Sequence, residues 1–465
     1  MERRKIVLIG AGSAVFTQGL VTDFIVSKNM GRWEIALVDI DEKALQSITT
    51  LAKKMVESKN ADIIISSSTN RRELLLGADV VVTTIAVGGR RAWENDVFIP
   101  RKYGVYQPVG DTTMPGGISR ALRMIPTMLD IARDVKELCP DAYFFNYSNP
   151  MTAICTAIKR EVGIPVIGLC HGVIHVEQYL AKFLGISSSE FKTFGVGLNH
   201  LTFLYDLRLK GKDAKPMLLE KLTKQKRLST SPENSNVEQF REMGGSDSDT
   251  PFYGDNPFSW QFFEKYNVFP AVLDRHVVEF FPERFPEGHY YGKTLGKDAF
   301  SFEKVIEYGD QVYERMHEQA VDGSINESLF NRSEGEHEQL VDILNSLYSD
   351  DRKMYSINIP NQGAVPSLPY EAVLEMPAIA SAKGFVPLFI NDLPEIPNSL
   401  LQNRITVVNL TVEAALTGDF SMFVEALLLD GSVNTEEAAT SLARELIEAH
   451  RVFLPQFGRN EIHST

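Results

Sequence analysis

The sequence predicts an α/β protein with a doubly wound, mainly parallel sheet, followed by a C-terminal substrate domain of α+β character. In the first 200 residues, short apolar segments alternate with segments of helical periodicity, which is the pattern of parallel strands joined by crossover helices. Beyond that point the apolar period becomes two and later mainly helical. A chain of 465 residues also exceeds what one core usually fills. We therefore predict two closely packed domains, residues 1–198 and 199–465.

The strands and helices of the first domain are expected in strict alternation. Short segments rich in Val, Ile, Leu and aromatic residues predict strands at residues 5–9, 34–38, 63–66, 79–87, 142–147 and 166–169. Apolar residues that recur every three to four positions predict helices at residues 14–27, 41–58 and 119–139.

The second domain is expected to begin with a strand at residues 201–210. Large apolar side chains occupy every second position from Leu201 to Leu209, which predicts a strand with one face exposed to solvent. Residues 221–250 are rich in Ser, Asn, Lys and Glu and are expected to form a mobile excursion. From residue 298 to the C-terminus helices are expected to dominate, including one at residues 435–451.

Composition narrows the class of protein. A formal net charge of −14 leaves no basic surplus to bind nucleic acid. The chain has no apolar stretch of about 18 residues, so no membrane span is expected. Its basic start and short apolar segment are not followed by a cleavage site. Three cysteines, Cys139, Cys155 and Cys170, do not make a disulfide framework, and we predict a cytoplasmic enzyme.

A turn after the first strand carries the sequence Gly10-Ala-Gly12-Ser13. The first glycine permits the tight turn, and the second lets the backbone approach a pyrophosphate at the helix N-terminus. We expect these three residues, Gly10, Gly12 and Ser13, to contact a dinucleotide. Val15 stands where a third small residue is usual, and a simple strand-to-helix turn is the alternative interpretation.

Asp39 strengthens the dinucleotide interpretation. It ends the second strand, where a carboxylate accepts hydrogen bonds from the adenosine ribose and repels a 2′-phosphate. NAD is therefore favoured over NADP, although Asp39 could instead cap the next helix. Gly88 and Gly89 follow the fourth strand at the same edge and offer a second close backbone approach. The first domain is thus predicted to be a Rossmann-type NAD-binding domain.

Two other strand ends carry residues that can bind a metal. Cys170 and His171 follow one apolar segment, and Asn199-His200 follows another. A thiolate and an imidazole at one sheet edge can hold a divalent cation with open positions for substrate oxygens. The alternatives are a small buried cysteine and a histidine that closes a loop.

The sequence resembles glycoside hydrolase family 4 along most of its length. The resemblance is carried by Gly10-Ala-Gly12-Ser13, Leu37-Val-Asp39-Ile-Asp41, Val87-Gly-Gly89, Pro115-Gly-Gly117, Asn146-Tyr-Ser-Asn149-Pro150, Cys170-His171-Gly172-Val173, Gly197-Leu-Asn199-His200, Asp274-Arg275-His276 and Asn361-Gln-Gly-Ala-Val-Pro366-Ser-Leu-Pro369. In that family a tightly held NAD oxidises the sugar at C3, and a divalent metal, typically manganese, supports removal of the C2 proton. The glycosidic oxygen is eliminated, water adds, and the hydride returns to C3.

The resemblance assigns a role to each matching residue. Cys170 and His200 are the expected metal ligands, and Asn149 is an expected substrate contact. His171 occupies the position of the general acid in α-specific members, a task that suits imidazole; a hydrogen-bonding role at the site is its alternative. Asp274 matches the position of the base that removes the C2 proton.

Two tyrosines remain rivals for the role of base. Some members use Tyr where Asp274 is expected, so Tyr253 and Tyr266 stay open as alternatives. Asp274 could also simply form a salt bridge with Arg275.

The residues that follow the expected metal ligand Cys170 indicate the substrate class. Cys170-His171-Gly172-Val173 resembles the α-glucuronidase subgroup, so we expect an α-D-glucuronide as substrate. A uronate needs a cation for its carboxylate. Arg275 is the first candidate, with Arg90 and Arg91 next, and His276 is an expected substrate contact.

Several alternatives to this function remain. Within the family they are α-galactosidase, α-glucosidase and α-galacturonidase. A lactate- or malate-type NAD dehydrogenase shares the Rossmann start and the Ser-Asn-Pro segment, and a non-catalytic NAD sensor is a third class. We also expect a homodimer or homotetramer, because open loops in such folds are often completed by a neighbouring subunit.

Overall fold

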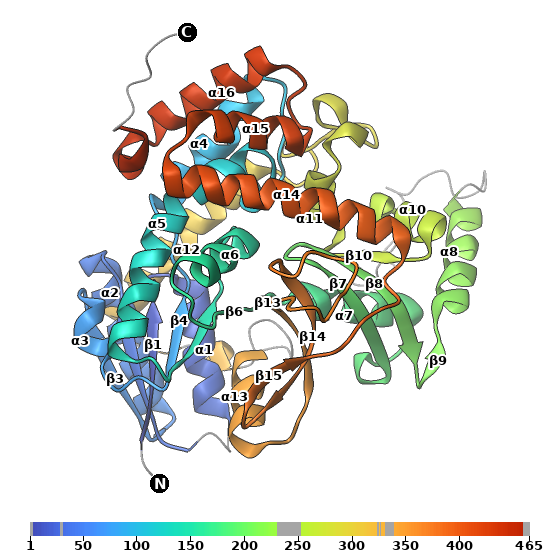
Figure 1. Ribbon diagram of the computed structural model, residues 1–465. Helices are drawn as coiled ribbons and strands as arrows, with labels where there is room; N and C mark the ends of the chain where they lie inside the picture. Colours follow the sequence, from blue (N-terminus) through green and yellow to red (C-terminus); the bar gives the residue numbers. More distant parts are fainter. Residues whose placement is uncertain are drawn as a thin grey trace.

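The computed structural model describes residues 3–27, 31–229, 253–322, 325, 327–330 and 339–458. In these residues one mixed sheet of 13 strands runs through the whole molecule, in the order β10-β8-β7-β14-β13-β6-β5-β4-β1-β2-β3, with β15 and β9 at its side (Figure 1). The sheet crosses the predicted domain boundary, so the two predicted domains share it.

The first six strands form a parallel half-sheet in the order β3-β2-β1-β4-β5-β6. These strands are β1 (Arg4–Ile9), β2 (Trp33–Val38), β3 (Ile63–Ser68), β4 (Val80–Thr83), β5 (Tyr143–Asn146) and β6 (Ile167–Gly168). This order is that of a dinucleotide-binding Rossmann sheet. The predicted α/β class and mainly parallel sheet are therefore confirmed.

The helices that join these strands include the three predicted ones and three further ones, at residues 71–75, 89–101 and 151–161. They are α1 (Ala14–Val26), α2 (Glu42–Ser58), α3 (Arg71–Leu75), α4 (Gly89–Arg101), α5 (Met114–Leu138) and α6 (Met151–Glu161). α5 begins five residues before the predicted start at 119, because Pro115 is suited to a first helical turn. β4 ends at Thr83, short of the predicted residue 87, because the chain then crosses the sheet edge, where the Ile85 N–H donates to Ser148 Oγ.

The antiparallel side of the sheet begins with a hairpin of β7 (Phe191–Leu198) and β8 (Leu201–Leu209). The predicted boundary between residues 198 and 199 falls within this hairpin, so a division there would separate paired strands. β10 (Phe269–Ala271) and β9 (Lys212–Asp213) pair with β8. The predicted exposed face of β8 is wrong over its first five residues, which are all buried. Phe203 packs in the main core and Leu204 in a second cluster on the other face.

Helices on this side of the molecule cover the antiparallel strands. They are α7 (Gly172–Leu184), α8 (Lys215–Ser229), α10 (Pro257–Tyr266) and the short α11 (Leu273–Val277). The predicted excursion at 221–250 is wrong for residues 221–229, which belong to α8, and residues 230–252 lie outside the described part. A small two-stranded sheet of β11 (His289–Tyr290) and β12 (Lys293–Thr294) follows α11.

The C-terminal third is mainly helical, as predicted, but it also returns strands to the sheet, which was not predicted. β13 (Met354–Pro360) pairs with β6, and β14 (Val373–Ser381) pairs with β13, β7 and β15 (Gly384–Pro387). Prolines and polar residues within these strands weaken the sequence pattern that predicts a β-strand. The helices here are α12 (Phe302–Asp322), α13 (Gln339–Ser349), α14 (Glu395–Thr417), α15 (Phe420–Asp430) and α16 (Glu436–Ala449). α16 confirms the helix expected at 435–451, with Thr435 as its N-cap.

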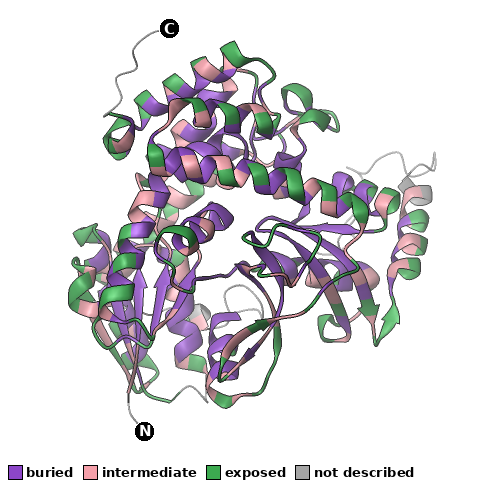
Figure 2. Cartoon of the chain, in the orientation of Figure 1, coloured by how far each residue is buried: buried purple, intermediate pink, exposed green. Residues whose placement is uncertain are grey.

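The strands form the buried centre, and exposed residues lie on the outer helices (Figure 2). α14 crosses the upper half of the molecule, below α15 and α16 in Figure 1, and contacts α5, α6 and β7. It therefore packs on both the parallel and the antiparallel parts. Within the described residues no helix is both long and apolar enough to span a bilayer.

Candidate active site

The turn from β1 to α1 has the geometry that dinucleotide binding requires. Gly10 has a φ of +94°, and a Cβ there would lie 2.7 Å from the Thr84 carbonyl oxygen, so only glycine fits. The Gly12 N–H donates to Asp39 Oδ2 over 2.7 Å. Ser13 is the N-cap of α1, and its side chain makes no capping hydrogen bond. The N-terminus of α1 is thus bordered by the carboxylate predicted to bind a ribose.

A second glycine turn lies at the end of the neighbouring strand. Gly88 and Gly89 have φ values of +78° and +58° and begin α4. A Cβ at Gly88 would lie 2.5 Å from the Ala92 Cβ and 2.9 Å from the Phe453 ring. Because β1 and β4 are paired, the two glycine turns meet at one edge of the sheet. The residues at this edge fit a bound dinucleotide, and we call Gly10, Gly12, Ser13, Asp39, Gly88 and Gly89 the cofactor edge.

Three side chains from distant parts of the chain converge beside this edge. One ligand atom each from Asp111, His200 and His276 lies within 4.8 Å of the other two. Asp111 is in the loop between α4 and α5, His200 turns the β7–β8 hairpin, and His276 is on α11. One carboxylate and two imidazoles are suitable ligands for a divalent transition metal such as Mn²⁺. These residues, the Asp111–His200–His276 cluster, fit a divalent cation.

The two imidazoles of the cluster are held close together. Their ring centroids are 4.2 Å apart. His200 has a φ of +68°, and its Nδ1 lies 2.8 Å from Thr112 Oγ1. Burial lowers the pKa of His200 and places the pKa of His276 well below its usual value. Both rings are therefore favoured in the neutral state that metal binding requires.

Asp111 is joined to a chain of amides. Burial raises the pKa of Asp111, but electrostatic interactions with His200, His276 and Arg120 outweigh burial, so the net pKa lies below its usual value. Asn149 Nδ2 donates to Asp111 Oδ2 over 3.0 Å. The predicted substrate contact Asn149 thus lies next to the cluster.

Asn199 extends this amide chain. Its Nδ2 donates to Asn149 Oδ1 over 3.0 Å, while its buried Oδ1 has no hydrogen-bond partner among the described atoms. An unpaired buried acceptor next to the cluster provides a position for a bound water or a sugar hydroxyl.

Sequence reasoning missed Asp111. A lone carboxylate in the loop between residues 101 and 114 has no periodic or spacing signal. The one available signal was its place four residues before Pro115-Gly-Gly117, a segment that already stood out.

Cys170 lies at the end of β6, as predicted, but is not part of the mutual 4.8 Å group. Its Sγ accepts the Gly172 N–H over 3.3 Å. Burial raises the pKa of the Cys170 thiol, and the nearby Glu375 and Asp111 carboxylates add to this. A cation would be needed to hold this thiol as the thiolate. Its role as a metal ligand stays a prediction.

His171 is exposed at the start of α7. Its charge lowers the pKa of both His200 and His276, which places it at the same site. An exposed imidazole next to a buried cluster has the access that a proton donor to a leaving group needs.

Asp274 is fully buried and accepts four hydrogen bonds. The donors are Phe258 N (2.8 Å) and Ser259 N (2.8 Å), Ser259 Oγ (2.5 Å) and the Tyr290 hydroxyl (2.6 Å). Burial raises the pKa of Asp274, and these hydrogen bonds counteract the rise. The arrangement favours a role in fixing α11 to α10. The role of Asp274 as the base stays a prediction.

The rival tyrosines lie apart from this site or outside the described side chains. Tyr266 ends α10, at the opposite end of that helix from the contacts with Asp274. The side chain of Tyr253 lies outside the described residues.

The cations proposed for a substrate carboxylate differ in their contacts. Arg90 and Arg91 both pair with Asp310. Arg275, next to His276 on α11, has a buried Nε without a hydrogen-bond partner among the described atoms, and it is not paired with Asp274. Arg275 is therefore the better placed of the three to bind an anion at the site.

Relatives of known activity match nearly the whole chain. The chain is 32% identical to an alpha-glucosidase of Erwinia rhapontici over 97% of this chain and 98% of the relative. It is 29% identical to an alpha-galactosidase of Bacillus subtilis (98% and 100%). It is 31% identical to an alpha-galacturonidase of Thermoanaerobacterium saccharolyticum (97% and 96%).

Solved structures share the fold of this chain to different extents. A 6-phospho-alpha-glucosidase from gut microorganisms, in complex with NAD and Mn²⁺, has a TM-score of 0.82 at 17% identity, covering 98% of this chain and 100% of its own. Cryptosporidium parvum malate dehydrogenase reaches 0.51 at 16%, covering 89% and 99%. The dehydrogenase thus shares the fold less completely.

Two family models match consecutive parts of the chain. The model of the family 4 glycosyl hydrolases matches residues 5–186, and the model of their C-terminal domain matches residues 195–433. The predicted resemblance is confirmed: this chain belongs to glycosyl hydrolase family 4.

Proposed function

We propose that this chain hydrolyses α-glycosides of uronic acids, with an α-D-glucuronide as the first candidate, and that it needs NAD and a divalent metal such as Mn²⁺. The observation that carries the uronate assignment is Arg275. Its buried Nε lacks a partner among the described atoms, and it lies beside the Asp111–His200–His276 cluster. A guanidinium with a buried, unpaired N–H group is stabilised by a carboxylate, which it binds through charge-assisted hydrogen bonds.

The cofactor edge supports the use of NAD. Gly10 and Gly12 form the tight turn before α1, whose N-terminus can bind a pyrophosphate, and Asp39 can accept hydrogen bonds from the ribose hydroxyls. When bound, NAD would take up and return a hydride, and a divalent metal would polarise sugar oxygens. Asp111, His200 and His276, with Cys170, are the residues that would hold the metal.

Other side chains would move protons and orient the sugar. His171, exposed at the rim of the site, would protonate the departing glycosidic oxygen. Asn149 and Asn199 present amide groups that can orient sugar hydroxyls. Asp274 would fix α11, so that Arg275 and His276 keep their positions towards the substrate.

A second candidate is α-galacturonidase. The relative from Thermoanaerobacterium saccharolyticum has that activity at 31% identity, and three further α-galacturonidases match at 28%. Galacturonides carry the same carboxylate, so Arg275 would serve both sugars. They differ from glucuronides only at C4, which makes the comparison of the two substrates a direct test.

The test is a panel of four aryl α-glycosides, the glucuronide, galacturonide, galactoside and glucoside, assayed with NAD, Mn²⁺ and a thiol reductant. We expect a uronide to be the preferred substrate, with loss of activity on chelation and slower turnover of the C2-deuterated substrate. A preference for a neutral sugar would overturn the uronate assignment. Activity that survives removal of both metal and NAD would overturn the mechanism.

Arg275→Gln tests the residue that carries the assignment. We expect kcat/KM for the uronide to fall by about 10- to 100-fold, as for a lost hydrogen bond to a charged group, with a much smaller change for the neutral glycosides. Arg208→Gln is the matched control, because Arg208 is exposed and pairs only with Asp206 among the described residues. An equal loss on uronide and neutral glycosides would contradict the assignment.

A further inference from the structure

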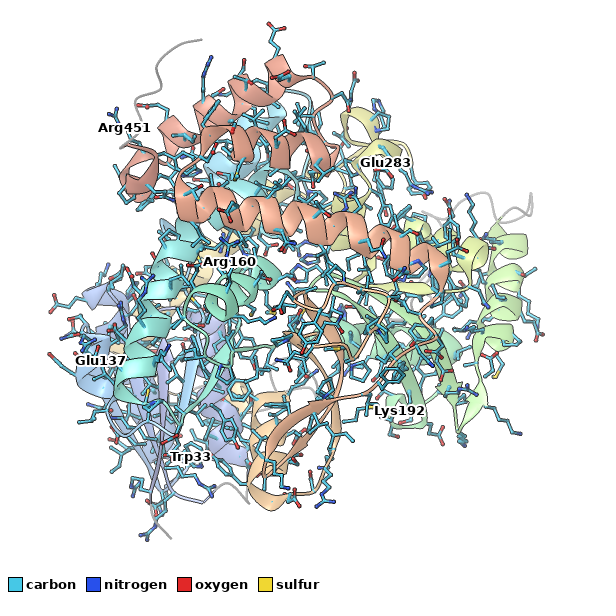
Figure 3. All side chains as sticks on the ribbon, in the orientation of Figure 1. Trp33, Glu137, Arg160, Lys192, Glu283 and Arg451 are labelled. Atoms are coloured by element: carbon cyan, nitrogen blue, oxygen red, sulfur yellow. The ribbon has the colours of Figure 1, made fainter. Side chains whose placement is uncertain are left out.

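A second pocket lies outside the active site, against α10. It has a volume of about 460 Å³ and lies between α10 and the segment from Arg284 to Tyr291. None of the residues that line it belongs to the cofactor edge or to the Asp111–His200–His276 cluster. Figure 3 shows Glu283, the neighbour of Arg284, on the loop at the upper right of the molecule. The volume of the pocket is in the range of small-molecule sites.

Aromatic rings form most of the pocket wall. Phe258, Phe262 and Tyr266 come from α10, and Phe285 and Tyr291 from the facing segment. The ring centroids of Phe258 and Phe285 are 5.2 Å apart, and those of Phe262 and Tyr266 are 4.6 Å apart. Such a wall suits the apolar face of a ring-shaped ligand.

The remaining charged groups of the lining are cationic. They are Lys265 and Arg284, and no carboxylate is among the described residues that line the pocket, although the chain carries a net charge of −14. Hydrogen bonds from Lys265 and Arg284 lower the pKa of the Tyr266 hydroxyl, so both cations reach the same point of the wall. Arg284 approaches Glu283 at 3.8 Å, with both side chains exposed, and such a pair contributes little. The Cζ of Arg284 also lies 5.9 Å from the centroid of the Phe258 ring. A guanidinium has more N–H donors than these contacts use.

The two walls are fixed to each other by one carboxylate. Asp274 Oδ2 accepts the N–H of Phe258 from the α10 wall and the hydroxyl of Tyr290 from the facing wall. The Tyr291 hydroxyl also donates to Gln261 Oε1 across the pocket over 2.7 Å. A pocket whose walls are joined in this way is preformed, which reduces the ordering cost of binding.

We propose that this pocket binds a carboxylate carried on a six-membered ring. The aromatic walls take the face of the ring, and Lys265 and Arg284 pair with the carboxylate. Both a free uronic acid and an aromatic acid have this chemistry. The proposal stands apart from the proposed function, because it does not use Arg275 or the Asp111–His200–His276 cluster.

The test is calorimetric titration of the NAD- and Mn²⁺-loaded protein with D-glucuronate and, separately, with benzoate. We expect at least one of the two to bind at a site that the double variant Lys265→Gln/Arg284→Gln weakens by tenfold or more. The matched neutral ligands, methyl glucoside and benzamide, should not bind there. Retained activity of the double variant on aryl glycosides will show that the catalytic site is intact.

Arg275→Gln separates this proposal from the proposed function. Binding of glucuronate at the active site should be lost in Arg275→Gln and kept in the double variant. Binding of an acid in the pocket should be kept in Arg275→Gln and weakened in the double variant. If the double variant weakens the binding of one acid tenfold, that acid is the ligand of the pocket. If the double variant binds both acids as tightly as the wild type, or if neither acid binds outside the active site, the proposal is wrong.

Discussion

The cofactor edge and the Asp111–His200–His276 cluster lie next to each other but are built in different ways. Each part of the cofactor edge is a short segment at the end of one parallel strand, and hydrogen bonds such as Gly12 N–H to Asp39 Oδ2 join neighbouring strands. The cluster takes one residue each from a loop, a hairpin and a five-residue helix. The first region is encoded locally, and the second exists only once the distant parts of the fold have packed.

The two regions also differ in the contacts that stabilise them. The cofactor edge lies on a continuous parallel half-sheet whose central strands, β1 and β4, bury all their apolar side chains. The cluster depends on contacts such as those of Asp274, which hold α11, and of Glu279, which accepts the N–H groups of Val109 and Gly110 beside Asp111. Disturbing such contacts should affect the cluster and leave the cofactor edge intact.

The largest expected effect comes from removing a member of the cluster. His200→Ala should lower kcat by roughly 100- to 1000-fold, the scale of losing a major electrostatic contribution, and should weaken Mn²⁺ binding measured by electron paramagnetic resonance. NAD binding, measured by fluorescence, should change little. Loss of NAD binding together with Mn²⁺ binding would contradict the separation of the two regions.

Asp111→Asn is the companion variant, because it keeps the size of the side chain and removes its charge. We expect weaker Mn²⁺ binding with unchanged NAD binding here as well. Unchanged Mn²⁺ affinity would remove Asp111 from the proposed metal site.

The same difference explains what the sequence could and could not predict. Gly10, Gly12 and Asp39 were predictable because each has a fixed place relative to a strand, and strands have a strong periodic signal. Asp111 was missed because no local rule connects a loop carboxylate with two distant histidines. His276 was predicted as a substrate contact from family resemblance, and only the fold places it beside His200.

The strands β13 and β14 show the same limit at the level of the fold. They are far from β6 and β7 in sequence but pair with them through Asn358–Gly168 and Glu375–Gly197. Pairing of this kind depends on tertiary packing, which apolar periodicity does not record. The strands of the parallel half-sheet alternate with helices along the first part of the chain and were predicted nearly one by one.

A smaller effect is expected at the cofactor edge itself. Asp39→Ala removes the acceptor of the Gly12 N–H and the predicted ribose contact, so NAD affinity should fall by about 10- to 100-fold. At saturating NAD, kcat should stay within a few-fold of the wild type, and Mn²⁺ binding should be unchanged. Asp62→Asn, an exposed carboxylate just before β3, is the control. A loss of turnover that added NAD does not restore would contradict this prediction.

Asp274→Asn distinguishes a positioning residue from a base. The variant leaves donors such as the Phe258 N–H poorly satisfied, so we expect a loss of about 1–3 kcal/mol in the free energy of unfolding. If Asp274 only positions α11, KM should rise more than kcat falls, and the isotope effect on C2 deuteration should persist. Turnover slowed by about 100-fold or more in a variant of normal stability would restore Asp274 as the base.

The smallest expected effect is a pH dependence at Glu279, which supports the loop of Asp111. Burial raises the pKa of Glu279 to about 8 from its ordinary value of 4.5. Between pH 4.5 and about pH 8, Glu279 therefore keeps its proton in the folded protein and loses it in the unfolded chain. Its contribution to stability is complete below pH 4.5 and is lost as the pH rises towards about 8.

Glu279→Gln imitates the protonated side chain and can still accept the N–H groups of Val109 and Gly110. In denaturant titrations from about pH 5 to about pH 8.5, the wild type should lose more stability with rising pH than the variant does. The Asp111–His200–His276 cluster depends on this loop, whereas the cofactor edge does not. Mn²⁺ affinity should therefore be less sensitive to alkaline pH in Glu279→Gln, with NAD affinity alike in both proteins. Equal pH slopes of stability in the two proteins would show that Glu279 is already ionised in the folded state.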